Sequence, residues 1–145
     1  MPFDHEKLRV YQAALRFIEW LHPILPAIPK TTAIHSQLDR ASTSIALNIA
    51  EGNGRRTSTD RVRFFDIACG SVRECAAGLD IAHRKGCLSD EQVLHGKQTL
   101  EQMLRQLLAL MKSHGLNYHD ELTGTRLRED SEQWEFQTEE KEVAV

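Results

Sequence analysis

The chain has 145 residues with an apolar fraction of 41% and an aromatic fraction of 6%, which fits one ordinary globular domain. It has no apolar run near the roughly 18 residues that a membrane span needs and no apolar stretch typical of a secretion signal, so we expect a cytoplasmic protein without a membrane partner. Residues 1–115 hold 15 Lys and Arg against 12 Asp and Glu, whereas residues 116–145 hold 3 against 9, which predicts a mildly basic domain before an acidic tail.

The first helix is predicted over residues 8–22, where apolar side chains recur every three or four positions. Three prolines between residues 23 and 29 end it. The second helix is expected to start at Thr31 or Thr32 and to stop at residues 52–54, where the run Gly-Asn-Gly breaks a helix twice.

Capping signals frame the other two helices. A cap at Thr57 or Ser58 predicts the start of the third helix, which should reach residue 85 and stop at the glycine that follows. A capping box that begins at Ser89 opens the fourth helix, and Gly115 closes it. No segment shows the alternation typical of strands, and short connections place successive helices antiparallel.

These elements predict an all-α fold, an antiparallel up-down-up-down four-helix bundle over residues 1–115, followed by a disordered acidic tail at residues 116–145. The simplest role of the tail is solubility. Two alternatives stay open, a linear motif around Trp134 and Phe136, or an acidic strip that covers the protein's own basic patch.

The third helix carries two apolar or small lines of side chains, a wider face than one amphipathic stripe, so we expect it to pack against more than one neighbour. Small residues along it would let another backbone approach, and large apolar residues on the first helix add surface. These features favour self-association. The predicted helix-packing or interface residues are Phe17, Trp20, Gly70, Ser71 and Gly78.

Glu74 falls on one of these apolar lines, where a buried carboxylate would need a partner. Arg40 and Glu51 share one face of the second helix, with Asn48 close by. We therefore predict a structural polar network of these four side chains that fixes the helix register. The alternative, in which Glu51 and Glu74 act as a general acid and base or bind a metal, lacks a supporting His or third acid.

Two sequence runs carry a family resemblance, Ser-Ile-Ala-Leu-Asn-Ile-Ala-Glu-Gly-Asn-Gly-Arg at residues 44–55 and Arg-Phe-Phe-Asp-Ile-Ala-Cys-Gly-Ser-Val-Arg-Glu at residues 63–74. They resemble the bacterial four helix bundle protein family, which includes proteins encoded in intervening sequences of large-subunit ribosomal RNA genes. That family is related to the accessory proteins of diversity-generating retroelements. The similarity covers about residues 7–113, and the matching positions are Asn48, Glu51, Gly52, Gly70, Ser71 and Glu74.

The resemblance implies a homo-oligomer, in particular a homopentameric ring. For the retroelement relatives it also implies a basic surface that engages reverse transcriptase and nucleic acid. This chain departs from those strongly basic relatives, because its sequence pI is near 6.2 and its tail is acidic. A basic surface must therefore be found in the residues themselves.

Four arginines, Arg55, Arg56, Arg61 and Arg63, lie within nine residues across the predicted loop and the first turn of the third helix. Free backbone N–H groups and the helix dipole there also favour anions. This cluster is the best candidate for binding RNA or DNA, and a solvated basic loop is the simpler alternative. It lacks aromatic residues for base stacking, so contacts should go to phosphates and weaken with salt.

Other chemistry has little support in the sequence. The three cysteines fit reduced, buried thiols, and the seven histidines form no metal-binding motif. We therefore expect no catalytic residue, metal or cofactor. The predicted function is that of a non-enzymatic homo-oligomeric accessory protein whose partner is a nucleic acid (RNA or DNA), a nucleoprotein or a nucleic-acid enzyme. The alternative is an oligomeric protein-interaction scaffold without nucleic-acid affinity.

Overall fold

The computed structural model of the chain describes residues 3–115, so the predicted tail lies outside the described residues. The helices in chain order are α1 (Arg9–Leu21), α2 (Ala33–Asn53), α3 (Ser58–Arg84) and α4 (Asp90–Ser113). Two short 3-10 helices, η1 (Asp4–Lys7) and η2 (Leu25–Ala27), were not predicted. The described part of the chain contains no strand, and the predicted all-α class is confirmed.

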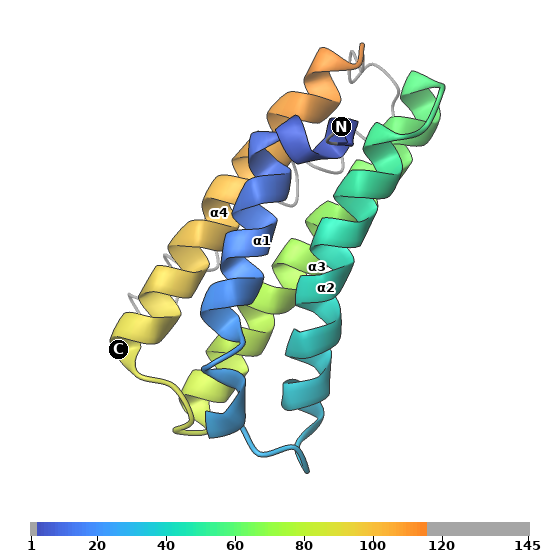
Figure 1. Cartoon of the computed structure of the whole chain (residues 1–145). Helices are drawn as coiled ribbons and strands as arrows, with labels where there is room; N and C mark the ends of the chain where they lie inside the picture. The colour runs from blue at the N-terminus through green and yellow to red at the C-terminus, as the bar shows by residue number, and fades with distance from the viewer. Residues whose placement is uncertain (1–2, 116–145) are drawn as a thin grey trace.

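The four helices run alternately up and down and form the predicted four-helix bundle (Figure 1). Helix α3 lies between α2 and α4, and α1 packs against α2 and α4 from the other side. This topology brings three segments to one end of the bundle: η1, the α2–α3 loop and the last turn of α4 (Figure 1).

The helix ends follow the predicted capping chemistry. The side chain of Thr57 accepts a hydrogen bond from the backbone N–H of Asp60 at 3.2 Å. Ser89 Oγ accepts the backbone N–H of Gln92 at 3.1 Å, and Gln92 Oε1 accepts that of Ser89 at 2.9 Å, which completes the capping box. Gly86 adopts a φ of +78°, the left-handed conformation that ends a helix and favours glycine.

The core is built from apolar side chains of all four helices, with Phe17, Phe65 and Leu107 among the fully buried ones. Burying each such side chain contributes about 1.5–3 kcal/mol. Of the two apolar lines predicted on α3, one packs against the core, and only its Ala76 is partly exposed; this line consists of Phe65, Ala68, Val72, Ala76 and Leu79. The other contains the exposed residues Ile67 and Ile81, so part of this face points away from the bundle.

Candidate nucleic-acid interface

The α2–α3 loop is tight because the end of α2 lies directly against α3. A Cβ atom at Gly52 would lie 2.8 Å from the ring of Phe65 and 3.0 Å from the backbone oxygen of Arg61, so this approach requires glycine. The backbone N–H of Gly54 then donates to two carbonyls of the last turn of α2. The short connection holds the arginine patch, which we define as Arg55, Arg56, Arg61 and Arg63, at one end of the bundle.

Three of the four arginines are positioned by local contacts. The guanidinium carbons of Arg55 and Arg63 lie 4.5 and 5.2 Å from the ring centroid of Phe64, within cation–π range. Arg55 also forms an ion pair with Glu51, one helical turn back on α2. Arg61 donates from Nε to the backbone oxygen of Arg55 at 2.6 Å. These contacts limit the number of conformations that the guanidinium groups sample.

The positive charge of the patch is only partly neutralised. Arg56 and Arg63 are exposed, and neither has an acidic partner within residues 3–115. A guanidinium remains charged throughout the physiological pH range. Two charges are therefore available to an anionic ligand, and one of them, that of Arg63, is already positioned by its contact with Phe64.

The end of α4 lies beside the patch. The ring centroid of His114, the C-cap residue of α4, is 5.9 Å from that of Phe65 on α3. Burial, and then the positive charge of Arg61, lower the pKa of His114 below its usual 6.5. The imidazole is therefore mainly neutral at neutral pH, and the charge here comes from the arginines.

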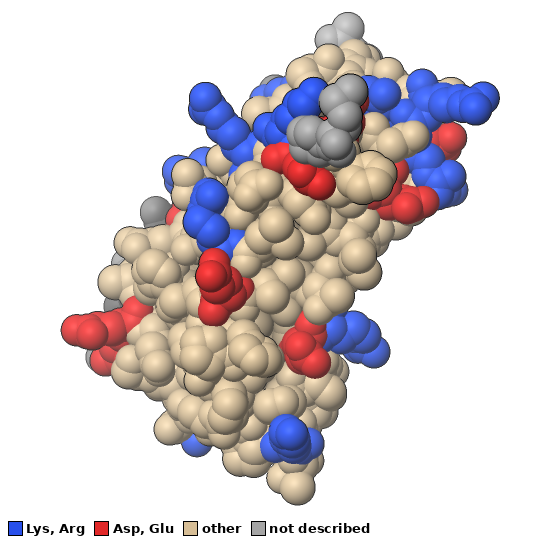
Figure 2. Space-filling model, viewed as in Figure 1, with Lys and Arg blue, Asp and Glu red and all other residues tan. Residues whose placement is uncertain are grey.

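Charge is unevenly distributed along the bundle. Figure 2 shows Lys and Arg side chains concentrated at the upper end, with some Asp and Glu side chains among them, where Figure 1 places the α2–α3 loop and the end of α4. Arg9 at the start of α1 and Lys112 near the end of α4 lie at this same end. An approaching polyanion would therefore meet its most favourable potential at this end of the molecule.

The predicted polar network of Arg40, Asn48, Glu51 and Glu74 does not assemble. Glu74 is exposed, so the expectation that it lies among apolar neighbours and needs a counterion is wrong. Within the described residues neither Arg40 nor Glu74 forms an ion pair, and Glu51 pairs with Arg55 instead. The physical reason is that α2 and α4 cover other sides of α3 and leave the Glu74 side in solvent.

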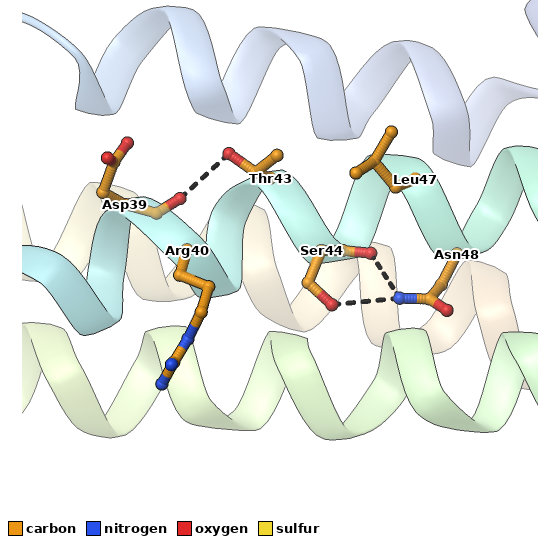
Figure 3. Close-up of a pocket in the computed structure, with 6 residues that line it drawn as sticks. All are labelled: Asp39, Arg40, Thr43, Ser44, Leu47 and Asn48. Atoms are coloured by element: carbon orange, nitrogen blue, oxygen red, sulfur yellow. Dashed lines mark hydrogen bonds between the residues drawn. The ribbon is translucent and has the colours of Figure 1, made fainter.

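A different polar cluster links α2 to α3. Asn48 Nδ2 donates to the backbone oxygen of Ser44 at 2.8 Å and to its hydroxyl at 3.0 Å (Figure 3). The hydroxyls of Ser44 and Ser71 lie 2.8 Å apart and share a hydrogen bond between the helices. Ser71 is only 7% exposed, so this bond fixes the register of α2 against α3. In the sequence, the four-residue spacing of Ser44 and Asn48 was the signal that these two side chains lie one helical turn apart and can form a hydrogen bond.

A shallow depression of about 300 Å³ lies on the outer side of α2. Arg40 extends across it toward α3, whereas Leu47 points to the opposite side and is 64% exposed (Figure 3). A surface formed by one helix does not enclose a substrate, so it lacks the concave shape of a small-molecule site. Its lining residues are Asp39, Arg40, Thr43, Ser44, Leu47 and Asn48.

The glycines predicted for packing have different environments. A Cβ atom at Gly78 would lie 2.6 Å from Cδ2 of Leu38, so α2 and α3 approach closely there. A Cβ atom at Gly70 would have no atom within 4 Å, so Gly70 is not a packing position within this protomer. The contact that the sequence pattern missed is at Gly96 on α4, whose added Cβ would lie 2.7 Å from the ring of Trp20.

The two large residues predicted on α1 also separate. Phe17 is 1% exposed and belongs to the core, which rules it out as an outer-surface residue of the folded protomer. Trp20 is half-buried, and its ring packs 5.7 Å from that of Phe17 and 5.2 Å from that of His95. Both residues therefore pack helices within one bundle.

Helix α3 presents an exposed line of small and apolar residues with one acid, Glu74, at its centre, which we call the α3 stripe. Its members follow each other at alternating steps of three and four residues, the spacing by which helices pair along a seam. Two of them, Ile67 and Ile81, are 46% and 42% exposed. The α3 stripe consists of Ile67, Gly70, Glu74, Ala77 and Ile81.

Cysteine and histidine chemistry is limited in the described part of the chain. No group of three His, Cys, Asp or Glu side chains between residues 3 and 115 could hold a metal ion. Burial raises the pKa of Cys69 and of Cys75 to about 12, so both thiols stay protonated. Among the described helices, none is long and apolar enough to cross a membrane.

The sequence matches a family model described as 23S rRNA-intervening sequence protein over residues 6–109. The chain belongs to this family. The region shared with other 23S rRNA-intervening sequence proteins includes all four helices up to residue 109, and with them the arginine patch and the α3 stripe. It excludes His114 and everything after it.

A solved structure supports the fold of this 23S rRNA-intervening sequence protein. It is the crystal structure of a protein of unknown function from the S23 ribosomal protein family of Bacteroides thetaiotaomicron. The two chains are 24% identical and align with a TM-score of 0.65 over 71% of this chain and 98% of that one. No curated protein matched the sequence.

Proposed function

We propose that this protein is a non-enzymatic, homo-oligomeric accessory protein that binds the phosphate backbone of a nucleic acid, free or within a nucleoprotein. The observation that carries the proposal is the arginine patch, in which Arg56 and Arg63 are exposed without an acidic partner in the described part of the chain. Arg55 and Arg61 beside them are already positioned by local contacts. Pre-positioned guanidinium groups lose less freedom when a phosphate binds.

The patch favours phosphates over bases. Its one aromatic ring, that of Phe64, is half-buried and has two guanidinium groups within about 5 Å. A nucleobase therefore has no open aromatic face on which to stack at this position. Recognition would be electrostatic and largely independent of sequence, as expected when contacts go to the backbone.

The α3 stripe supports self-association with a second copy of the chain. Its spacing suits helix pairing, and its two isoleucines are 46% and 42% exposed in the protomer. A second copy can therefore bury the isoleucines. A closed ring, with five subunits as the family resemblance implies, would repeat the patch and add weak contacts through multivalency.

The exposed apolar side chains also favour a second candidate, a protein-interaction scaffold without nucleic-acid affinity. Leu47 on α2 and Ile67 on α3 are 64% and 46% exposed, and a partner that covers these apolar side chains does not need to be charged. The name of the family links these proteins to intervening sequences of 23S rRNA but states no ligand, so the arginine patch alone favours the first candidate. The two candidates differ in whether the arginine patch matters for binding.

Binding to a labelled 20-nucleotide oligouridine, followed by fluorescence anisotropy at low salt, tests the proposed function. The variant with Arg56→Gln and Arg63→Gln should bind about tenfold or more weakly, since each phosphate contact is worth on the order of 1 kcal/mol at low salt. The matched control changes Arg84→Gln and Lys85→Gln, which are exposed near the opposite end of the bundle. Equal binding by both variants, or no binding by the parent, would refute nucleic-acid binding by the arginine patch. The protein-interaction scaffold would then be the remaining candidate.

Light scattering coupled to size exclusion tests the self-association separately. The mass should be a multiple of the 16.5 kDa chain, and Ile67→Lys with Ile81→Lys should reduce it because two charges would enter the α3 stripe. Both positions are exposed in the protomer, so the bundle itself should still fold. A 16.5 kDa species at micromolar concentration would refute the oligomer.

A further inference from the structure

We infer that an acidic segment of this chain, residues 129–142, docks on the arginine patch of the protein and restricts the access of other polyanions. The competition between this segment and other polyanions rests on the proposed function, whereas the docking of the segment does not. The occupant of the arginine patch is a part of the same chain. Three observations support the docking: where the described chain ends, how the charges match, and how far the segment can reach.

The described chain ends next to the patch. Helix α4 closes with His114 and Gly115, and Gly115 has a φ of +78° with its N–H donating to the backbone oxygen of Lys112 at 3.2 Å. His114 is close enough to Arg61 for the guanidinium charge to lower its pKa. Residue 116 therefore begins at the end of the bundle that carries the arginines (Figure 1).

The charges of the segment and the patch are complementary. Residues 129–142 contain seven Asp and Glu and one Lys. The patch contains four arginines, of which Arg56 and Arg63 have no acidic partner in the described residues. Multiple carboxylates facing a guanidinium cluster can form charge-assisted hydrogen bonds. Such contacts between exposed charges are weak singly and are screened over about 8 Å at physiological salt.

The covalent tether makes weak contacts sufficient. Glu129 follows Gly115 by 14 residues, which span at most about 50 Å when fully extended. A tether of this length keeps the segment near the patch at an effective concentration on the order of millimolar. A free oligonucleotide at micromolar concentration would have to displace it.

The segment also offers aromatic rings for the guanidinium groups. Trp134 and Phe136 alternate with acids in the run Glu-Gln-Trp-Glu-Phe at residues 132–136. The patch already shows this kind of contact internally, since Arg55 and Arg63 both lie over the ring of Phe64. Tryptophan is the ring that binds cations best, so Trp134 gives the segment a contact that a phosphate backbone lacks.

Trp134 reports docking directly in the full-length protein, because Trp20→Phe makes it the sole tryptophan. Quenching of Trp134 by acrylamide should rise about twofold between 20 and 500 mM NaCl as screening releases the segment. With Arg56→Gln and Arg63→Gln added, quenching should already be high at low salt. The control with Arg84→Gln and Lys85→Gln should behave like the parent. Salt-independent quenching in the parent would overturn the inference, whatever the protein binds.

A second full-length experiment measures the competition. Replacing Glu129→Gln, Asp130→Asn and Glu132→Gln should tighten binding of the 20-nucleotide oligouridine about tenfold if the segment covers the patch for about nine-tenths of the time. The matched control makes the same chemical changes at the exposed residues Glu19, Asp39 and Glu91 and should change binding by less than about twofold, because these sites lie away from the patch.

The two experiments separate the inference from the proposed function. Salt-dependent quenching that needs Arg56 and Arg63, with no oligouridine binding by any variant, would uphold docking and refute nucleic-acid binding. Equal gains in affinity from the segment variant and from its control would show a net-charge effect and would overturn the inference. A gain confined to the segment variant, together with salt-dependent quenching, is the result we expect.

Discussion

Replacing Gly78 by alanine tests how closely α2 and α3 must pack. The added Cβ would lie 2.6 Å from Cδ2 and 2.9 Å from Cγ of Leu38. Leu38 is 1% exposed and cannot move into solvent to make room. Forcing a methyl group into such a site costs about 1–3 kcal/mol, while the higher helix propensity of alanine returns about 1 kcal/mol. We therefore expect the free energy of unfolding to change by about 0 to −2 kcal/mol.

Gly70→Ala is the matched control, because it makes the same change in the same helix where a Cβ would have no atom within 4 Å. Within one protomer only the propensity gain applies there, so in the Ile67→Lys, Ile81→Lys background Gly70→Ala should raise the free energy of unfolding by about 0.5–1 kcal/mol. Urea unfolding followed by circular dichroism measures both variants, and light scattering checks that their assembly is unchanged. If Gly78→Ala proved as stable as Gly70→Ala, the close contact with Leu38 would be refuted.

Three further predictions concern titration, reactivity and the exposed acid. Because the pKa of His114 in the folded state lies below its usual 6.5, the unfolded chain takes up this proton first. The free energy of unfolding should therefore fall as the pH drops through about 6.5, and His114→Gln should remove that part of the dependence in urea titrations at several pH values. The native protein should react with one equivalent of a thiol reagent at the half-buried Cys87, and three equivalents should react only after denaturation, since Cys69 and Cys75 are buried. Glu74→Ala should change the thermal stability of the protomer by less than about 0.5 kcal/mol, and a larger loss would mean that its carboxylate has a partner after all.

The helix ends were predictable because their signals are local. Thr57 and Ser89 cap their helices through contacts only three residues along the chain, and Gly86 takes the backbone conformation that its residue type favours. The short helix η2 was missed because its proline was interpreted only as a helix stop. A proline also fixes φ near the helical value, and here it lies in the first turn of a 3-10 helix.

The orientation of α3 could not be predicted from its own sequence. Periodicity identified two apolar lines, but which of them lies against the core depends on where α2 and α4 pack. As a result Glu74 and Gly70 were assigned to packed positions and are in fact exposed. The contact between Gly96 and Trp20 was missed for the same reason, since it joins residues that are distant in the sequence.

The arginine patch was predictable as a cluster but not as an arrangement. Its position followed from the loop, and the four-residue spacing of Glu51 and Arg55 is that of a helical ion pair. The place of Phe64 beneath two guanidinium groups required the three-dimensional structure. So did the proximity of His114, because it depends on α4 returning to the same end of the bundle.

The most direct test of nucleic-acid binding by the arginine patch is the salt dependence of the affinity for oligouridine. If the three arginines outside the ion pair with Glu51 (Arg56, Arg61 and Arg63) each neutralise a phosphate, a plot of log K against log salt should have a slope of about −2 per engaged patch. Arg56→Gln with Arg63→Gln should make this slope shallower by about 1.4, while Arg84→Gln with Lys85→Gln should leave it unchanged. A slope near zero, or the same slope in both double variants, would contradict the proposal that the patch binds the phosphate backbone.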